Sequence, residues 1–443
     1  MMKISVVGLG KLGAPLLAVV ASKGFDVVGI DLNQNFVDQV NAGQAPVQEP
    51  QLQELITAHK DKIRATTDYD DAVLSTEVTL VIVPTPSGKE GVFLNDYLLQ
   101  SMEKIGESLK KKSGYHLVVI KSTVMPGSTG GEIQKRLEQA SQKIVGEDLG
   151  LCYSPEFIAL GSVVKNLLYP DLILIGESDR KAGDLLEKIY QAICDHDPTI
   201  RRMNFVNAEI TKISINTFVT TKISYANMLS DICQHLEGAD VDVVTAAVGV
   251  DSRIGSKYIK AGVAFGGPCF PRDNIAFGAL AKKIGARADI ANATQQINQY
   301  QNHRLQALIQ SHAKSNRVGV LGLAYKVGTS VVEESQSIQI ANQLSEKGYQ
   351  VSVYDPLAMN EAKKVVVKEI YFAASVKECL ENSDTVILML PYSEFASQIT
   401  SELIRGKVVI DCWRLVSREY AHLCDLIHLG CRSLQPSSVA EVR

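Results

Sequence analysis

The residue type best suited to nucleophilic chemistry is a cysteine that follows two glycines and a proline. The run reads FGGPCFPRDN over residues 265–274. Glycine and proline favour a tight turn followed by the first turn of a helix. Cys269 would then lie near the positive end of a helix dipole, which favours the thiolate and therefore nucleophilic attack. Asp273 follows four residues later, so its carboxylate shares one helix face with the thiol.

Local spacing leaves a second interpretation of Cys269 open. Most free cysteines are small buried hydrophobic residues, and ten residues of sequence show neither exposure nor a partner base. The motifs elsewhere in the chain favour the reactive thiol.

A glycine turn between a strand and a helix opens the chain. Residues 3–7 are an apolar run typical of a buried strand, GLGKLG follows at 8–13, and an apolar helix is expected over 14–22. The glycines let the backbone approach a pyrophosphate, whose charge faces the helix amino terminus. A second expected strand, 26–30, ends at Asp31, 21 residues after Gly10 (31 minus 10). A carboxylate there can accept both ribose hydroxyls and repels a 2′-phosphate, which predicts NAD rather than NADP.

Polar residues follow the next expected strands. Residues 79–83 end in PTP with Thr85, residues 117–120 end in KSTVMPG with Thr123, and CYSPEF at 152–157 places Glu156 at a further strand end. Strands alternating with helices predict a parallel, doubly wound α/β sheet whose ligands lie at the carboxyl ends of the strands. Ordinary turn chemistry is the alternative for the two threonines, and a solvated turn is the alternative for Glu156. The predicted cofactor contacts are Gly8, Gly10, Lys11, Leu12, Gly13, Asp31, Thr85 and Thr123.

A long helix is expected from about residue 207 to 235. Its apolar residues predict that it is largely buried. Lys212 and Asn216 are four apart and share a face near its start. One interpretation is that both side chains belong to a solvent-exposed polar face of the helix. The other is that they face a cleft, where they would bring a cation and a hydrogen-bond donor to a reacting oxygen. Arg253 and Lys260, in the loop region that follows, suit a phosphate group. The apolar residues are Ile210, Ile213, Phe218, Ile223, Met228, Leu229 and Ile232.

Near residue 315 the sequence begins to repeat its own start. RVGVLG at 317–322 matches KISVVG at 3–8, an offset of 314, and the match of 347–355 to 23–31 has an offset of 324. The second copy therefore carries ten extra residues, around 329–339. Ala324 replaces the second glycine of the turn, so we expect this unit to bind something other than an intact dinucleotide. Lys326 and Arg414, at its strand ends, are candidates for holding a second phosphorylated ligand.

Composition excludes several classes of protein. A chain of 443 residues is too long for one hydrophobic core, and 46% hydrophobic with 21% charged residues is ordinary for a globular protein. The net charge of −4 gives no argument for nucleic acid or an anionic membrane. The eight cysteines contain no CxxC pair and the eight histidines no ligand-spaced cluster, so neither a metal site nor a disulfide framework is predicted. No signal peptide or membrane-spanning run is seen, and we expect a cytoplasmic protein.

Together the motifs resemble the UDP-glucose/GDP-mannose dehydrogenase family over essentially the whole chain. The matching segments, in order, are VVGLGKLG, GQAPVQEPQLQEL, PTP, KSTVMPGST, SPEF, AEITKISIN, DSRIG, FGGPCFPRD and GLAYK. The resemblance implies two Rossmann-like doubly wound parallel-sheet domains joined by a central helical domain with a long helix. We place the NAD-binding domain at 1–204, the helical dimerisation and catalytic domain at 205–305, and the UDP-binding domain at 306–443. A homodimer or higher homo-oligomer is expected, formed through the long helix.

The resemblance also implies roles for single residues. Cys269 is the covalent nucleophile in a four-electron oxidation that passes through a thiohemiacetal and a thioester. Lys212 and Asp273 position a water and steady the developing alkoxide, while Asn216 helps bind the oxyanion. Glu156 assists thioester hydrolysis, with Thr123 nearby. The substrate contacts implied are Glu156, Phe157, Lys212, Asn216, Arg253, Lys260, Phe265, Gly266, Lys326 and Arg414.

Two positions depart from the family pattern and leave the substrate open. Members acting on UDP-glucose usually read PEFLxEG, but here Leu160 replaces the second glutamate, and Glu333 stands where an arginine is usual. UDP-glucose is the leading substrate, with a UDP-N-acetylhexosamine, UDP-galactose or GDP-mannose as alternatives. A two-electron dehydrogenase of the hydroxyacid type and a catalytically silent nucleotide-sugar binding protein are further alternatives. The first of these has no use for Cys269, and intact catalytic residues argue against the second.

Overall fold

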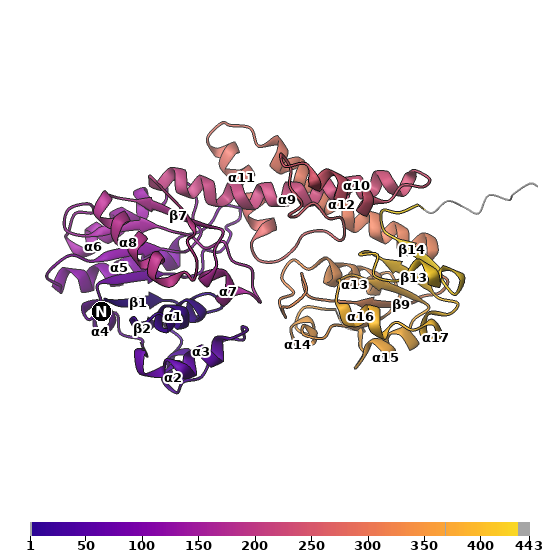
Figure 1. The fold of residues 1–443 in the computed structure, drawn as a ribbon, viewed down its shortest axis with the longest axis horizontal. Helices are drawn as coiled ribbons and strands as arrows, with labels where there is room; N and C mark the ends of the chain where they lie inside the picture. Colours follow the sequence, from indigo (N-terminus) through magenta and orange to yellow (C-terminus); the bar gives the residue numbers. More distant parts are fainter. Residues whose placement is uncertain (1, 368, 433–443) are drawn as a thin grey trace, which may run out of the picture. The chain divides into compact units, whose positions relative to one another are not determined.

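The computed structural model describes residues 2–367 and 369–432. The chain divides into two compact units, Met1–Ser214 and Ile215–Arg443. A helix of 31 residues, α9 (Phe205–His235), begins in the first unit and continues in the second (Figure 1). The three-domain division expected from the sequence stays a prediction.

The first unit is built on an eight-stranded sheet in the order β3-β2-β1-β4-β5-β6-β7-β8. Neighbouring strands are parallel except β6 and β7, which are antiparallel. The central strands are mostly apolar because helices cover both faces of the sheet, and the buried hydroxyls of Ser5 and Thr79 hydrogen-bond each other. The strands are β1 (Lys3–Val7), β2 (Asp26–Ile30), β3 (Ile63–Thr66), β4 (Val78–Val81), β5 (Leu117–Ile120), β6 (Gly150–Tyr153), β7 (Leu172–Glu177) and β8 (Thr199–Met203).

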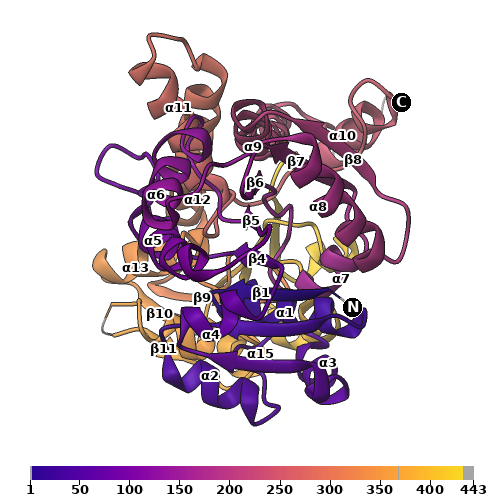
Figure 2. The ribbon, with the colours of Figure 1, turned by 90° about the vertical axis from the view of Figure 1, so that its left-hand side faces the viewer.

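Two separate helix layers cover this sheet, as Figure 2 shows. Residues of α1, α2, α3, α7 and α8 form one apolar core with the sheet, and those of α4, α5 and α6 form another on the opposite face. The bounds are α1 (Gly13–Ser22), α2 (Gln34–Asn41), α3 (Leu52–Ala58), η1 (Lys60–Lys62), α4 (Tyr69–Leu74), α5 (Asp96–Lys111), η2 (Thr129–Ile133), α6 (Gln134–Ser141), α7 (Val163–Leu168) and α8 (Arg180–Ile193). The predicted doubly wound α/β fold is therefore confirmed.

The second unit contains a six-stranded parallel sheet in the order β11-β10-β9-β12-β13-β14. Counted from its own first strand, this is the order of the first six strands of the other sheet, so the internal repeat seen in the sequence is structural. The strands are β9 (Arg317–Leu321), β10 (Gln350–Tyr354), β11 (Tyr371–Phe372), β12 (Thr385–Leu388), β13 (Val408–Asp411) and β14 (Asp425–His428).

Helices of two kinds make up the rest of the second unit. One set precedes the sheet: the greater part of α9, α10 (Val241–Val250), α11 (Phe270–Lys283) and α12 (Asp289–His312). The other set lies between the strands: α13 (Gln336–Glu346), α14 (Met359–Ala362), α15 (Val376–Glu381), α16 (Ser393–Gln398), α17 (Ser401–Ile404) and η3 (Arg418–His422).

The prediction that α9 is largely buried by its apolar residues is wrong in part. Ile213 is buried, but Phe218 is 67% exposed, Ile232 48% and Ile210 40%. In the second unit small polar residues lie on the buried face instead. The Ser224 hydroxyl, for example, donates to the Thr294 carbonyl of α12 at 3.0 Å. Such side chains satisfy their own hydrogen bonds and allow close helix packing, so apolar residues do not mark the covered face of this helix. In the second unit its fully buried polar residues are Thr220, Ser224, Asn227 and Ser230.

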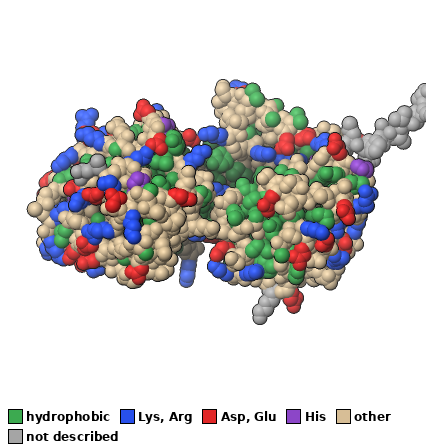
Figure 3. Space-filling view, turned by 60° about the horizontal axis from the view of Figure 1, so that its bottom comes forward, with side chains coloured by type: hydrophobic (Ala, Val, Ile, Leu, Met, Phe, Trp, Pro, Cys, Tyr) green, Lys and Arg blue, Asp and Glu red, His purple; other side chains and the backbone are tan. Residues whose placement is uncertain are grey.

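On the face drawn in Figure 3, acidic and basic side chains are interspersed. Within residues 2–367 and 369–432, no helix has the length and apolar character needed to cross a membrane.

Candidate functional site

The glycine turn after β1 has the shape of a pyrophosphate cradle. Gly8 has φ +95°, and a Cβ on Gly13 would lie 1.7 Å from the Gly8 carbonyl oxygen, so both positions require glycine. A Cβ on Gly10 would meet no protein atom within 4 Å, which leaves space open above the turn. Helix α1 begins beside that space without a side-chain cap. Its amino-terminal N–H groups can therefore serve an anionic ligand.

Asp31 lies where the ribose of a dinucleotide would be recognised. It follows β2, and its Oδ2 accepts the Leu9 N–H at 2.6 Å while Oδ1 accepts the Asn33 N–H at 2.8 Å. Each oxygen uses one lone pair in this way, so a second remains for a ribose hydroxyl. The turn and this carboxylate together fit NAD, which would supply a hydride acceptor when bound.

The two strand-end threonines predicted for the site lie together. The Thr85 hydroxyl donates to the Thr123 carbonyl at 2.7 Å, and the Ser122 hydroxyl donates to Val83 at 2.6 Å. These bonds join the segments that follow β4 and β5. Thr85 is buried and Thr123 half-buried, whereas Lys11 at the glycine turn is exposed.

Three predicted substrate residues of the first unit meet at the start of α9. The Lys212 ammonium donates to the Glu156 carbonyl at 2.6 Å and lies 4.6 Å from the centre of the Phe157 ring. Lys212 is 6% exposed. The PEF segment that follows β6 and the lysine of α9 are thus in direct contact.

A residue that the sequence reasoning passed over stands beside Glu156. Lys121, the first residue after β5, forms an ion pair with Glu156 Oε1 and donates to the Tyr190 hydroxyl of α8 at 2.5 Å. The sequence did contain a signal for this residue: a lysine directly after a fully buried strand needs a charged or hydrogen-bonding partner nearby.

In the second unit Cys269 is the N-cap of α11 and its side chain is exposed. The Asp273 N–H donates to the Cys269 carbonyl at 2.8 Å, so the carboxylate lies one turn along the helix. Asp273 is 1% exposed and accepts from Asn216 Nδ2 at 2.6 Å. Arg272, which the sequence analysis did not single out, has its Nε 3.5 Å from Asp273 Oδ1. The predicted thiol, carboxylate and amide are therefore arranged around the start of this helix.

The loop before Cys269 is held by partners far away in the sequence. Asn298 of α12 exchanges two hydrogen bonds with the Phe265 backbone, at 2.8 and 3.0 Å. The Ala264 N–H donates to the Gln336 side chain, and the Gly267 N–H donates to the Glu333 carbonyl at 3.0 Å.

The same loop is packed against aromatic rings and against the segment around Glu333. The Phe265 ring packs edge-on against Phe270. Gly266 is buried, and a Cβ there would lie 2.2 Å from the Glu334 carbonyl oxygen. The thiol loop thus rests on the residues inserted in the second copy of the repeat.

The second sheet uses its strand-end acid differently from the first. Asp355 follows β10 as Asp31 follows β2, but it is 1% exposed and accepts four backbone N–H groups. A carboxylate offers about four acceptor sites, so none is left for a ribose. Asp355 is therefore not available to a ribose in the way that Asp31 is. The four donors are Leu323, Ala324, Leu357 and Ala358.

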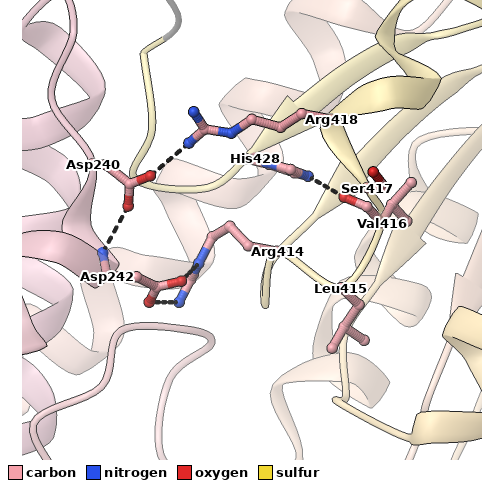
Figure 4. Close-up of a pocket in the computed structure, with 8 residues that line it drawn as sticks. All are labelled: Asp240, Asp242, Arg414, Leu415, Val416, Ser417, Arg418 and His428. Atoms are coloured by element: carbon pink, nitrogen blue, oxygen red, sulfur yellow. Dashed lines mark hydrogen bonds and ion pairs between the residues drawn. The ribbon is translucent and has the colours of Figure 1, made fainter.

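Arg414 lines a polar pocket of about 310 Å³ (Figure 4). Its guanidinium forms a bidentate pair with Asp242, at 2.6 and 2.9 Å, and donates to the carbonyls of Cys412, Leu429 and Ala261. These five bonds use all five N–H groups of the guanidinium. Arg414 can therefore contact a diphosphate only if one of its present acceptors is replaced by a phosphate oxygen. The pocket is lined by Asp240, Asp242, Arg414, Leu415, Val416, Ser417, Arg418 and His428.

The other basic residues predicted to contact substrate lie at several places in the second unit. The half-buried Lys326 has its ammonium 5.9 Å from the centre of the Tyr325 ring. Arg253 is paired with Asp251 at 2.6 Å, and Lys260 is exposed. Their roles stay predictions. No metal-binding group of three His, Cys, Asp or Glu side chains occurs in the described part of the chain.

Comparison with known proteins accounts for both units. Three domains of the UDP-glucose/GDP-mannose dehydrogenase family match the chain: the NAD binding domain at residues 2–194, the central domain at 206–300 and the UDP binding domain at 319–418.

Individual relatives cover nearly the whole chain. A UDP-glucose 6-dehydrogenase of Haloferax volcanii is 36% identical, with 94% of this chain and 98% of the relative covered. A GDP-mannose 6-dehydrogenase of Pseudomonas savastanoi pv. phaseolicola is 33% identical, with 93% and 95% covered. The solved structure of a UDP-glucose dehydrogenase from Pyrobaculum islandicum superposes with a TM-score of 0.88 at 30% identity, covering 98% of each chain. The chain therefore belongs to the UDP-glucose/GDP-mannose dehydrogenase family, as its motifs predict, and its amino-terminal domain is the NAD-binding domain of that family.

Proposed function

We propose that the chain oxidises the C6 alcohol of a nucleotide sugar, with UDP-glucose as the leading substrate, to the uronic acid. Two hydrides leave C6 and one water oxygen enters, so each sugar consumes two NAD and one water and yields two NADH, a carboxylate and three protons. The reaction passes through an aldehyde, a thiohemiacetal on Cys269 and a thioester on the same sulfur.

The placement of Cys269 carries this proposal. An exposed thiol at a helix N-cap, one turn before a buried aspartate, is an environment that favours the thiolate. A dehydrogenase that stopped at a carbonyl would need no nucleophile there.

The other residues take roles that their surroundings permit. Lys212 and Asp273 position a water and steady the alkoxide, and Asn216, which already donates to Asp273, helps bind the oxyanion. Glu156 assists hydrolysis of the thioester, with Thr123 nearby. Phe157, Phe265, Gly266, Arg253, Lys260, Lys326 and Arg414 contact the nucleotide sugar.

The test is the yield of NADH per molecule of nucleotide sugar. A small panel of UDP and GDP sugars is supplied in limiting amount with NAD in excess, and absorbance at the NADH wavelength is followed to completion. Two NADH per sugar are expected, and the reacting member names the substrate. One NADH would mean that the reaction stops at a carbonyl and would return Cys269 to a packing role.

Leu160 favours testing sugars other than glucose in the same panel. The leucine packs against the apolar core of the first unit, in a segment held by Glu49, which accepts from Gly161 and Val163. A second carboxylate is therefore missing from this loop, and relatives of similar identity carry the names of both UDP-glucose and GDP-mannose dehydrogenases.

Cys269→Ser tests the covalent step directly. We expect acid formation to fall by several orders of magnitude while NAD binding is kept, because a serine ester replaces the thioester poorly. The measurements are uronate formation and cofactor binding by fluorescence titration. Normal acid production by this variant would remove the covalent mechanism and favour a two-electron dehydrogenase.

A further inference from the structure

Lys121 is a buried cation that the roles described above do not use. Its side chain is 2% exposed, and it pairs with Glu156 Oε1. Its ammonium also donates to the Tyr190 hydroxyl at 2.5 Å, and that hydroxyl lies 2.5 Å from Ser154 Oγ. A buried ammonium is stable only with charged and hydrogen-bonding partners, so Lys121 depends on the other members of this cluster.

Three elements of the first unit bring the cluster together. Lys121 follows β5, Ser154 and Glu156 follow β6, and Tyr190 belongs to α8. Strands β5 and β6 are parallel neighbours in register, with Ile120 opposite Tyr153. The cluster therefore lies at the carboxyl edge of the sheet, where ligands of doubly wound folds bind.

The charge state of the pair is defined by its surroundings. Burial alone would lower the pKa of Lys121, but the Glu156 carboxylate and the Tyr190 phenol outweigh burial and hold that pKa above its ordinary value. Lys121 therefore remains an ammonium across the physiological range.

Glu156 is consequently held at both ends. Lys212 donates to its backbone carbonyl and Lys121 pairs with its carboxylate, so both the backbone and the side chain of Glu156 are anchored. Oε1 is committed to Lys121, so Oε2 is the oxygen that remains for a water molecule. Preorganisation of this kind lets a carboxylate act without reorganising during the reaction.

We propose that Lys121 is a positioning residue for hydrolysis of the Cys269 thioester, acting through Glu156, with Tyr190 as its support. This rests on the proposed function. In the step concerned, the water oxygen bonds to the thioester carbon, the carbon–sulfur bond breaks and Cys269 leaves as the thiolate. Glu156 Oε2 accepts the water proton and passes it to solvent; no electrons are transferred.

Because Lys121 is assigned to thioester hydrolysis alone, its loss should cause the acyl-enzyme to accumulate. Without Lys121 the two oxidations proceed, but the acyl-enzyme is released slowly. Lys121→Gln should therefore give a burst of two NADH per active site, then a steady-state rate lowered roughly tenfold or more, since a positioned base contributes about 10²–10⁴ in rate. Intact-protein mass spectrometry should detect the acyl adduct, mapped to Cys269.

Two further variants distinguish a positioning role of Lys121 from a general loss of stability. Lys112→Gln removes another half-buried lysine of the same unit, one that donates to the Val73 and Thr76 carbonyls, and it should give no adduct. In a Glu156→Gln background, Lys121→Gln should add little further loss, because both act on the same step.

Each outcome either supports or overturns the assignment. A lower rate of Lys121→Gln without adduct, or full additivity with Glu156→Gln, overturns it. If Lys121→Gln does not fold, Tyr190→Phe, which removes one partner of the ammonium and keeps the ion pair, should accumulate the same adduct at a lower level, and its absence overturns the proposal. A wild-type yield below two NADH per sugar would instead contradict the proposed function itself.

Discussion

At the scale of single residues, the eight cysteines occupy two kinds of environment. Cys269 is the exposed one. Burial raises the pKa of Cys379 and of Cys412 to about 12, and that of Cys194 to about 11. Those three thiols stay protonated at neutral pH, which makes them poor nucleophiles, whereas the exposed Cys269 is the thiol to which the proposed function assigns nucleophilic attack.

Asp31 gives a prediction about cofactor choice. Asp31→Asn keeps an oxygen for the Leu9 N–H but removes the charge that would accept ribose hydroxyls and repel a 2′-phosphate. We expect the KM for NAD to rise roughly tenfold, as loss of a charge-assisted hydrogen bond predicts, and the preference over NADP to shrink. The kcat/KM values with each cofactor measure both effects. Asp26→Asn, at the start of the same strand, serves as the control, and an unchanged preference would contradict the assignment.

His116 gives a prediction about stability and pH. It is 1% exposed, with ring nitrogens 2.8 Å from the Thr79 hydroxyl and 3.1 Å from the Lys112 ammonium. Burial and, second, the charge of Lys112 lower the pKa of His116 to about 3. Between that value and the ordinary pKa of about 6.5 the unfolded chain binds more protons, so stability falls as pH falls through this window. The loss attributable to this group is about 2 kcal/mol at pH 5.

Denaturant unfolding at several pH values measures this effect. His116→Gln should reduce the pH dependence between pH 4 and 6.5, in addition to any constant loss of stability. His59→Gln, at a half-buried histidine directly after α3, is the matched control. Equal pH dependence in wild type and His116→Gln would show that another group titrates in this range.

At the scale of elements, the sequence predicts most of what local pattern controls. The strands predicted at 3–7, 26–30 and 117–120 have those bounds, since apolar runs between glycine turns and polar residues mark buried parallel strands. The N-cap position of Cys269 also follows from its neighbours. The face of α9 that is covered does not, because small polar residues and not apolar ones line it.

Contacts between distant segments are the part of the site that the sequence does not reveal. Asn298 and Gln336 hold the backbone just before Cys269 from 33 and 72 residues away. Both are ordinary amides in amphipathic helices, and nothing in their own surroundings marks them. Lys121 was within a recognised motif, but its partner Tyr190 is 69 residues away. Sequence patterns identify candidate catalytic residues that lie in one segment more readily than the residues of distant segments that hold them in place.

The thiol loop gives a prediction at the element scale. Gly267 has φ +84°, and a Cβ there would lie 2.5 Å from the Tyr325 ring. Gly267→Ala should therefore displace the loop and lower kcat at least tenfold, because a small misplacement of a reacting group costs about 10²-fold. Gly285→Ala, at φ +74° with open space around it, imposes similar backbone strain without the clash. Turnover and thiol alkylation rate are measured for both variants, and equal effects would assign the loss to backbone strain alone.

At the scale of the whole molecule, one sheet design serves two different ligands. Both sheets place an acid after the second strand, but Asp31 keeps acceptor capacity and Asp355 is saturated by backbone N–H groups. The acid of the second sheet has become a structural cap for its own glycine turn. The same strand order therefore carries an acid that is free to accept further hydrogen bonds in the NAD-binding domain and an acid that is fully occupied in the domain matched by the family's UDP binding domain.

The exposed apolar face of α9 gives the last prediction, that the chain is a homodimer through this helix. Phe218, Tyr225 and Ile232 recur every seven residues and are 67%, 47% and 48% exposed. Such a seam of large apolar side chains on one helix face is typical of a helix that packs against a second copy. Phe218→Glu combined with Ile232→Glu would bury two unpaired carboxylates in that contact, which weakens association by a factor of roughly 30 or more.

Light scattering after size exclusion measures the mass of each variant directly. The wild type should have twice the chain mass at micromolar concentration, and the double variant should have the mass of one chain with unchanged circular dichroism. Ile144→Glu is the matched control, since Ile144 is 54% exposed and belongs to the loop between α6 and β6 rather than to α9. A monomeric wild type would contradict the dimer, whereas a double variant that kept twice the chain mass would place the contact between copies on another surface.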